Sequence, residues 1–312
     1  MTVLLCPGQG AQVVGMGREF AAQFPSARRV FDRADQALGF PLAETLFTGT
    51  EDEVNRTDIA QPGILTVTVA IWTVLLERGL VPPPVTAFIG LSLGEYTAHH
   101  LAGTLTFEDA VRLTRRRGEA MQAASDACPS GMAAVLGVEV DVCERCCAEV
   151  RADGGVVVVA NLNTPGQVVI SGENGALAAA SAKLTAAGAK RIIALKVAGA
   201  FHSPVMEPAR RALEEALEGV RLVDPRTPVI SNVTAEPVTT AAAARATLAR
   251  QVVSPVLLER SLRAVIASGA TTFVEPGPGR AMAGFVKKID RALTCAGYET
   301  PTDLPASSGG AS

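Results

Sequence analysis

The apolar positions in the first 125 residues alternate between short unbroken runs and longer helix-like stretches. Residues 3–6 and 85–91 form short, almost wholly apolar runs, which are typical of strands buried on both faces. The longer stretches at residues 62–78 and 107–124 favour helices. Short strands that alternate with helices indicate a parallel sheet covered by helices.

The pattern changes between residues 132 and 198. The strand-like runs "MAAVLG", "VVVVA", "QVVIS" and "RIIALKVA" are separated by the helix-like "DVCERCCAEV" and "GALAAASAKLTAAG" and by the turn "NTPG". The order β-α-β-β-α-β is typical of a ferredoxin-like unit. We therefore predict a small domain over residues 129–198, inserted into a large α/β domain of residues 1–128 and 199–298.

The chain after the small domain returns to helices and two short strands, "TPVIS" and "TTFVE", and then to a helix over residues 281–293. The last residues are small, polar and interrupted by proline, which predicts a flexible tail over residues 299–312. An inserted domain leaves a cleft beside the larger one, where we expect the functional site.

Composition and charge narrow the class of protein. With 48% apolar and 19% charged residues, the 312-residue chain is expected to form a packed globule. A net charge of −3 gives no basic field, so we expect no nucleic-acid or membrane partner. We find no run of about 18 apolar residues and no signal-like start. The sequence therefore predicts a cytoplasmic protein, which we expect to be a monomer.

Six cysteines are too few and too scattered for a disulfide framework in a chain of this size, so we expect reduced thiols. Cys143, Cys146 and Cys147, in "CERCC", have zinc-like spacing, but no second Cys or His pair stands nearby. We interpret them as helix cysteines and predict no metal.

The stretch "GLSLGE" at residues 90–95 fits G-x-S-x-G between an apolar run and a helix-like segment. Glycines on both sides allow a sharp strand-to-helix turn and leave the Ser92 oxygen at a helix N-terminus, where negative charge is favoured. Ser92 is therefore a candidate nucleophile. A bare five-residue pattern is also typical of an ordinary turn with a capping serine.

A serine nucleophile needs a base, usually histidine, and the chain has three histidines. His99 and His100 follow Ser92 on the same helix, and a rise of 1.5 Å per residue puts them roughly 10 Å away and out of reach. His202, in "VAGAFHSPV", remains as the candidate base. An isolated histidine is more often a polar surface or buried residue, and elimination is what favours His202.

One arginine of the helix predicted over residues 107–124 points inward. At 100° per residue Arg117 lies in the middle of the apolar stripe, while Arg112, Arg115 and Arg116 project elsewhere. A guanidinium on a buried face needs an anion, and its planar fork matches a carboxylate. The anion is either an internal Asp or Glu or the carboxylate of a substrate.

The glycine-rich "CPGQGAQ" directly follows the first strand. It lacks both G-x-G-x-x-G and the lysine of a P-loop, so a nucleotide cradle is disfavoured and an oxyanion-hole loop fits better.

These motifs, in this order, closely resemble the malonyl-CoA:acyl carrier protein transacylases and the stand-alone acyltransferases that serve polyketide synthases. The resemblance covers residues 1 to about 293 and implies an α/β-hydrolase-like large domain with an inserted ferredoxin-like small domain. The blocks that carry it are "PGQGAQ", "TDIAQP", "GLSLGEYTA", "RRRGEAMQ", "ANLNTPGQVVISG", "GAFHS", "SNVTAEPV" and "VEPGPG".

Carried onto matching positions, the resemblance makes Ser92 the nucleophile and His202 the general base. It implies an oxyanion hole made by the backbone N–H groups of Gln12 and Leu93. It also implies that a backbone carbonyl near Gln251 orients the histidine.

For the substrate, the resemblance implies that Arg117 binds the free malonyl carboxylate and that Gln61 lines the pocket. Phe201, in the malonyl-type signature "GAFH", is expected to crowd an α-methyl branch. Leu91 departs from the family, which usually has histidine before the nucleophile, and we expect it to alter acyl selectivity or hydrolytic leakage.

The implied reaction passes a malonyl group from malonyl-CoA to Ser92 and then to the phosphopantetheine thiol of an acyl carrier protein. It implies no bound cofactor, because CoA belongs to the substrate and phosphopantetheine to the carrier. Leu91 and the discrete length favour a polyketide pathway over fatty-acid synthesis.

Two other functions stay open. A proofreading acyl hydrolase would pass acyl groups to water, but such hydrolases tend to lack the carboxylate-binding arginine. A silent module would only dock carrier proteins, and loss of the serine or the histidine would have indicated it. Acidic carrier helices suit either of two basic pairs, Arg115 with Arg116 or Lys287 with Lys288.

Overall fold

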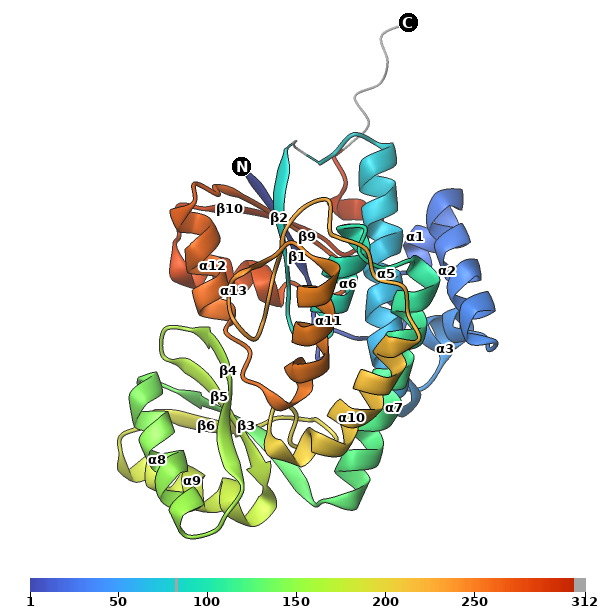
Figure 1. The fold of residues 1–312 in the computed structure, drawn as a ribbon. Coiled ribbons are helices and arrows are strands. Elements are labelled where there is room, and N and C mark those ends of the chain that lie inside the picture. Colours follow the sequence, from blue (N-terminus) through green and yellow to red (C-terminus); the bar gives the residue numbers. More distant parts are fainter. Residues whose placement is uncertain (82–83, 306–312) are drawn as a thin grey trace, which may run out of the picture.

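The structure is a computed structural model that describes residues 1–81 and 84–305 (Figure 1). Its larger sheet has β1 (Thr2–Cys6) in the interior, paired in parallel with β2 (Val85–Gly90) on one side and β9 (Thr272–Pro276) on the other. Within the described part of this larger sheet, the one antiparallel pairing joins β7 (Val229–Ile230) to β8 (Pro237–Val238), so the predicted parallel sheet is confirmed. In spatial order the strands are β10 (Thr294–Tyr298), β9 (Thr272–Pro276), β1 (Thr2–Cys6), β2 (Val85–Gly90), β7 (Val229–Ile230) and β8 (Pro237–Val238).

Both faces of this sheet are buried because helices cover each of them (Figure 1). Leu4 and Cys6 of β1 belong to the core on one face, and the alternate residues Val3 and Leu5 to the core on the other. The helices that contribute to the first core are α1 (Arg18–Gln23), α2 (Pro25–Leu38), α3 (Leu42–Thr48), α4 (Glu51–Asn55), α5 (Thr57–Glu77), α6 (Gly94–Leu101), α7 (Phe107–Ala127), α10 (Glu207–Glu218) and α11 (Ala241–Arg250). Those of the second core are α12 (Leu258–Ala267) and α13 (Ala281–Ile289).

Helix α5 begins earlier than predicted. It begins at Thr57 and continues through Pro62, where the sequence suggested a start. Proline has no N–H to donate to the carbonyl of Asp58, and Arg115 Nη1 donates to that oxygen instead, at 3.0 Å. Threonines interrupt every apolar run of α5, but an 18-residue window of the helix still has a mean hydropathy of 1.8. That window is 89% buried, so the apolar character reflects its place in the core.

The smaller sheet consists of four antiparallel strands (Figure 1). Their spatial order is β4 (Val157–Thr164), β5 (Gln167–Glu173), β3 (Ser130–Leu136) and β6 (Arg191–Ala194). This order and the sequence of elements confirm the inserted ferredoxin-like unit. Cys143, Cys146 and Cys147 lie in its apolar core, where burial raises the thiol pKa of Cys143 to about 11 and of Cys147 to about 12. The elements are β3 (Ser130–Leu136), α8 (Val140–Ala152), β4 (Val157–Thr164), β5 (Gln167–Glu173), α9 (Asn174–Ala186) and β6 (Arg191–Ala194). The exact domain boundaries stay predictions.

The C-terminal region corrects two expectations. Helix α13 ends at Ile289, and the chain then adds β10 to the sheet edge, a strand that a run rich in small residues did not signal. Part of the predicted tail is ordered, because residues 301–303 form a short 3-10 helix. There the Asp303 carboxylate accepts from two backbone N–H groups and pairs with Arg280. Residues 306–312 lie outside the described part of the chain.

Candidate active site

Ser92 lies on a sharp turn between β2 and α6. Its backbone is left-handed, with φ of 53°, a conformation that costs energy for a residue other than glycine. A Cβ atom at Gly90 would lie 2.0 Å from the carbonyl carbon of Gly94, and one at Gly94 would lie 2.2 Å from the carbonyl oxygen of Cys6. Both flanking positions therefore require glycine, and the strand–turn–helix context predicted for the motif is confirmed.

An asparagine from a distant loop holds this turn. Asn232 follows β7 and is 1% exposed. Its Oδ1 accepts from the N–H of Ser92 at 2.7 Å, and its Nδ2 donates to the carbonyl of Gly90 at 2.6 Å. One side chain thus satisfies a buried donor and a buried acceptor around the strained residue. Nothing in the sequence by itself linked Asn232 to the turn.

The structure brings His202 to the serine. Its Nε2 lies 2.7 Å from Ser92 Oγ, and its Nδ1 lies 2.9 Å and 3.2 Å from the carbonyl oxygens of Gln251 and Ser254. Because a carbonyl only accepts, Nδ1 carries the proton and Nε2 presents a lone pair to the hydroxyl. Burial, together with the positive charge of Arg117, lowers the pKa of His202 to about 4. The ring is therefore neutral at neutral pH and able to accept a proton.

The other two histidines lie toward the far end of α6, as their spacing predicts. His99 Nδ1 lies 3.3 Å from Thr104 Oγ1, and His100 Nδ1 lies 3.1 Å from the carbonyl oxygen of Leu105. Burial lowers the pKa of both rings. Their contacts are with the turn that follows α6 rather than with Ser92.

Arg117 points into the site, as its position in the apolar stripe of α7 predicts, and is 1% exposed. Its guanidinium donates to Gln61 Oε1 at 2.8 Å, to Gln251 Oε1 at 2.9 Å and to Ser92 Oγ at 3.0 Å. No Asp or Glu oxygen of the described chain lies within 4 Å of it, and its Nε has no partner there. The internal ion pair considered as an alternative is therefore absent from the described residues, and burial lowers the pKa of Arg117.

Gln251 connects the members of the site. Its backbone oxygen accepts from His202 and its side-chain oxygen from Arg117, while its Nε2 donates to the carbonyl of Ser92 at 2.9 Å and to Glu95 Oε2 at 2.5 Å. Because the backbone carbonyl of Ser92 only accepts, it fixes which end of the Gln251 amide faces Arg117. Glu95 is fully buried, and burial raises its pKa to about 7. The family resemblance pointed to the backbone carbonyl of Gln251, whereas its side-chain contacts with Arg117 and Glu95 had no signal in the sequence.

Three further predicted residues lie in different surroundings. Gln61 is fully buried, with its oxygen on Arg117 and its Nε2 3.5 Å from Met121 Sδ. Phe201 is 5% exposed and belongs to the same apolar cluster as Met121. Leu91 is half-buried and packs against the core on the α12–α13 face of the sheet.

The loop after β1 lies against the serine turn. Leu91 N–H donates to the carbonyl of Cys6 at 3.0 Å, and a Cβ atom at Gly8 would lie 2.4 Å from the Leu91 oxygen. Within the part of the chain described, the backbone N–H groups of Gln12 and Leu93 donate to no other group. Leu93 adjoins Ser92 in the chain, whereas the Gln12 side chain donates to Asn55, and the role of both N–H groups stays a prediction.

Fold and site together define an α/β enzyme with a serine–histidine pair on a strand–helix turn and a buried arginine beside it. The model of the acyl transferase domain family matches residues 3–290. The malonyl CoA-acyl carrier protein transacylases of Bacillus subtilis and Escherichia coli K12 are 43% and 38% identical to the chain over 300 residues. These alignments cover 96% of this chain and 94% and 96% of theirs.

Solved structures of malonyl transacylases have the same fold as this chain. MCAT from Streptococcus pneumoniae has a TM-score of 0.92 at 42% identity, covering 97% of this chain and 98% of its own. A malonyl-transacylase in complex with a type II PKS acyl-carrier protein has a TM-score of 0.93 at 36% identity, covering 97% of each chain. The chain therefore belongs to the acyl transferase domain family, among the malonyl CoA-acyl carrier protein transacylases, and is an acyltransferase.

Proposed function

We propose that the protein transfers a malonyl group from malonyl-CoA to the phosphopantetheine thiol of an acyl carrier protein through an acyl-enzyme on Ser92. The observation that carries the proposal is Arg117. Its buried guanidinium donates to the serine oxygen and has no carboxylate within 4 Å among the described residues. A malonyl carboxylate would supply the missing anion next to the nucleophile. The names of the curated relatives support the same donor and acceptor.

In the first half-reaction the Ser92 oxygen bonds to the thioester carbon while its proton passes to His202 Nε2, 2.7 Å away. The carbon–sulfur bond then breaks, His202 returns the proton to the departing sulfur, and CoA leaves as the thiol. In the second half the carrier thiol gives its proton to His202 and attacks the ester, and Ser92 recovers its proton. The neutral, Nδ1-protonated ring is suited to both roles.

The thioester oxygen becomes negatively charged in each half. We assign the donors that meet it to the free N–H groups of Gln12 and Leu93, at the loop that touches the serine turn and at the start of α6. Preorganised donors of this kind stabilise a transition state by about 3 kcal/mol each. The position of Leu93 at a helix N-terminus adds a favourable dipole.

Selectivity for malonyl follows from the buried cation. An acetyl group would leave Arg117 without an anion, while a malonyl group pairs with it. Phe201 belongs to the same apolar cluster as Met121, which Gln61 contacts, and it is expected to crowd a methyl branch at the α-carbon.

The test combines the protein with malonyl-CoA and a phosphopantetheinylated carrier protein and measures both malonyl-carrier and free malonate. We expect malonyl-carrier as the main product and its loss in Ser92→Ala and His202→Ala. Malonate as the main product would instead identify a hydrolase. The absence of both products would identify a docking module.

The preference for a polyketide carrier stays a prediction, which a lower KM for such a carrier than for a fatty-acid carrier would support. Of the two basic pairs considered for docking, Arg115 contacts Asp58 and Glu119 at 2.8 Å and 2.7 Å, so its charge is already offset. We therefore favour Lys287 and Lys288. Reversing both charges should raise the KM for the carrier and leave self-acylation by malonyl-CoA unchanged, and unchanged carrier kinetics would contradict this docking surface.

A further inference from the structure

A cavity of about 720 Å³ lies at the opposite end of helix α6 from Ser92. Its walls come from α2, α5, the end of α6 with the turn after it, and the segment over residues 221–226. Helix α6 has eight residues, so the cavity lies about 12 Å from the serine along the helix axis. None of the catalytic or malonyl-binding residues named above lines it.

Four arginines surround this cavity: Arg29, Arg33, Arg221 and Arg226. Arg33 pairs with Glu108 at 2.9 Å. Across residues 1–81 and 84–305, the guanidinium groups of the other three make no hydrogen bond and no ion pair. The whole chain has a net charge of −3, so this local excess of positive charge does not reflect a basic composition.

The wall that carries Arg226 is fixed by the backbone. Val223 N–H donates to the carbonyl of Thr104 at 3.1 Å, and Arg226 N–H donates to that of Ala102 at 2.8 Å. Gly103, between them, has a left-handed φ of 84°, and a Cβ atom there would lie 3.4 Å from Arg226 Nε. The arginine therefore lies directly over a glycine on a wall that is already held in place.

The floor of the cavity is apolar, with Val30, Val69, Trp72 and Leu105 contributing to it. Its volume falls within the usual range for small-molecule sites, about 300–1,000 Å³. A guanidinium fork matches the paired oxygens of a phosphate, and several unpaired forks match a ligand with several negative charges. An apolar floor matches an uncharged organic part on the same ligand.

We propose that this cavity binds a small organic phosphate of the nucleoside diphosphate class. The phosphate groups contact the three unpaired arginines, and the nucleoside lies against the apolar floor. The site is independent of the acyl-transfer site, and its existence does not depend on the function proposed above.

The chain carries its own probe for this ligand, because Trp72 is its only tryptophan and lines the cavity. Titration with ADP, with no acyl substrate present, should change the Trp72 emission in a saturable way. Pyrophosphate and adenosine, which carry only the charge and only the nucleoside, should each bind more weakly than ADP. Adenosine binding as tightly as ADP would overturn the role of the arginines.

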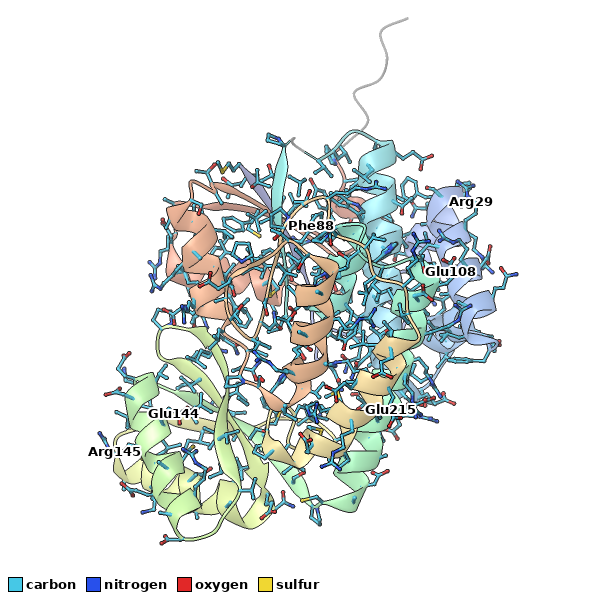
Figure 2. All side chains as sticks on the ribbon, viewed as in Figure 1. Arg29, Phe88, Glu108, Glu144, Arg145 and Glu215 are labelled. Atoms are coloured by element: carbon cyan, nitrogen blue, oxygen red, sulfur yellow. The ribbon has the colours of Figure 1, made fainter. Side chains whose placement is uncertain are left out.

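Substitutions test the same point. Arg29→Ala and Arg226→Ala should each raise the Kd for ADP about tenfold, the effect of losing one charge-assisted hydrogen bond. The matched control is Arg145→Ala, an exposed arginine of α8 that Figure 2 shows on the small domain, across the molecule from Arg29. All three variants should retain malonyl transfer.

Two results would overturn the site: no saturable change in emission with ADP, or the same Kd in Arg145→Ala, Arg29→Ala and Arg226→Ala. If ADP bound only at the thioester site, these arginines would not contact it. All three variants would then have the same Kd, which is the second of these results. Malonyl transfer is assayed separately, so a negative result here leaves the proposed function untouched.

Discussion

Replacing Arg117 with methionine removes the guanidinium and keeps an unbranched side chain in the buried position. The wild-type guanidinium donates to two glutamine oxygens and to Ser92 Oγ. A malonyl carboxylate would meet its planar fork with two charge-assisted hydrogen bonds. The substitution therefore removes the group that distinguishes malonyl from acetyl and leaves the serine and the histidine in place.

The size of the effect follows from those two bonds. Each charge-assisted hydrogen bond contributes about 1.5–3 kcal/mol, so two contribute about 4 kcal/mol, or about a thousandfold in kcat/KM. We expect kcat/KM for malonyl-CoA to fall by about that factor. With acetyl-CoA we expect little loss, because the wild-type site already leaves the cation without an anion when acetyl is bound. The ratio of the two values should therefore fall about a thousandfold.

The assay measures self-acylation rates with each thioester. Thermal unfolding must accompany it, because the substitution leaves the side-chain oxygens of Gln61 and Gln251 unpaired, at about 1–3 kcal/mol each. Arg112→Met, at an exposed position of the same helix, is the matched control and should change neither rate. An equal loss of kcat/KM with malonyl-CoA and acetyl-CoA would contradict a role for Arg117 in binding the carboxylate, since the arginine would then act on the serine.

Three further outcomes are expected. Asn232→Ala removes both hydrogen bonds that hold the turn of Ser92, and thermal unfolding and transfer kinetics should show a loss of about 2–4 kcal/mol in stability together with a lower kcat. His202 must be neutral to accept a proton, so kcat/KM should stay level across the neutral range and fall only as the pH approaches about 4, which a pH–rate profile checks. Gly8→Ala places a Cβ atom 2.4 Å from the carbonyl oxygen of Leu91, so steady-state kinetics should show a lower kcat with little change in the KM for malonyl-CoA.

Each outcome has a control. Asn232→Asp keeps an oxygen acceptor but no donor and should lie between wild type and Asn232→Ala; full activity in Asn232→Ala would show that the turn needs no support. A midpoint near the ordinary histidine value of about 6.5 would contradict a buried neutral His202. Gly284→Ala, where a Cβ atom meets nothing within 4 Å, should leave kcat unchanged. An equal effect of Gly8→Ala and Gly284→Ala would show that close packing of the loop against Leu91 is not needed for catalysis.

Periodicity located the parts of the site that depend on one element. The helical period placed Arg117 inward, and the rise per residue excluded His99 and His100. The order of strand-like and helix-like segments predicted both sheets, because each strand and helix has its own local pattern of apolar residues. Family motifs then placed His202 beside Ser92, a pairing that elimination among three histidines also favoured.

The hydrogen bonds that support the catalytic residues could not be predicted from local sequence patterns. Asn232 and Ser92 lie 140 residues apart, and Gln251 and Glu95 lie 156 apart, so only the folded chain joins them. A similar limit applies to α5, whose passage through Pro62 depends on Arg115 satisfying the carbonyl that proline leaves free. Strand β10 forms by pairing with the free edge of β9. Its own small residues have low strand propensity, so the local sequence does not predict it.

The central claim is a malonyl ester on Ser92, and the most direct measurement is the intact mass of the protein after mixing with malonyl-CoA. We expect a gain of one malonyl group, located by fragmentation to the peptide that contains Ser92 and absent in Ser92→Ala. A malonyl adduct that persists in Ser92→Ala, or wild-type turnover without any adduct, would contradict it.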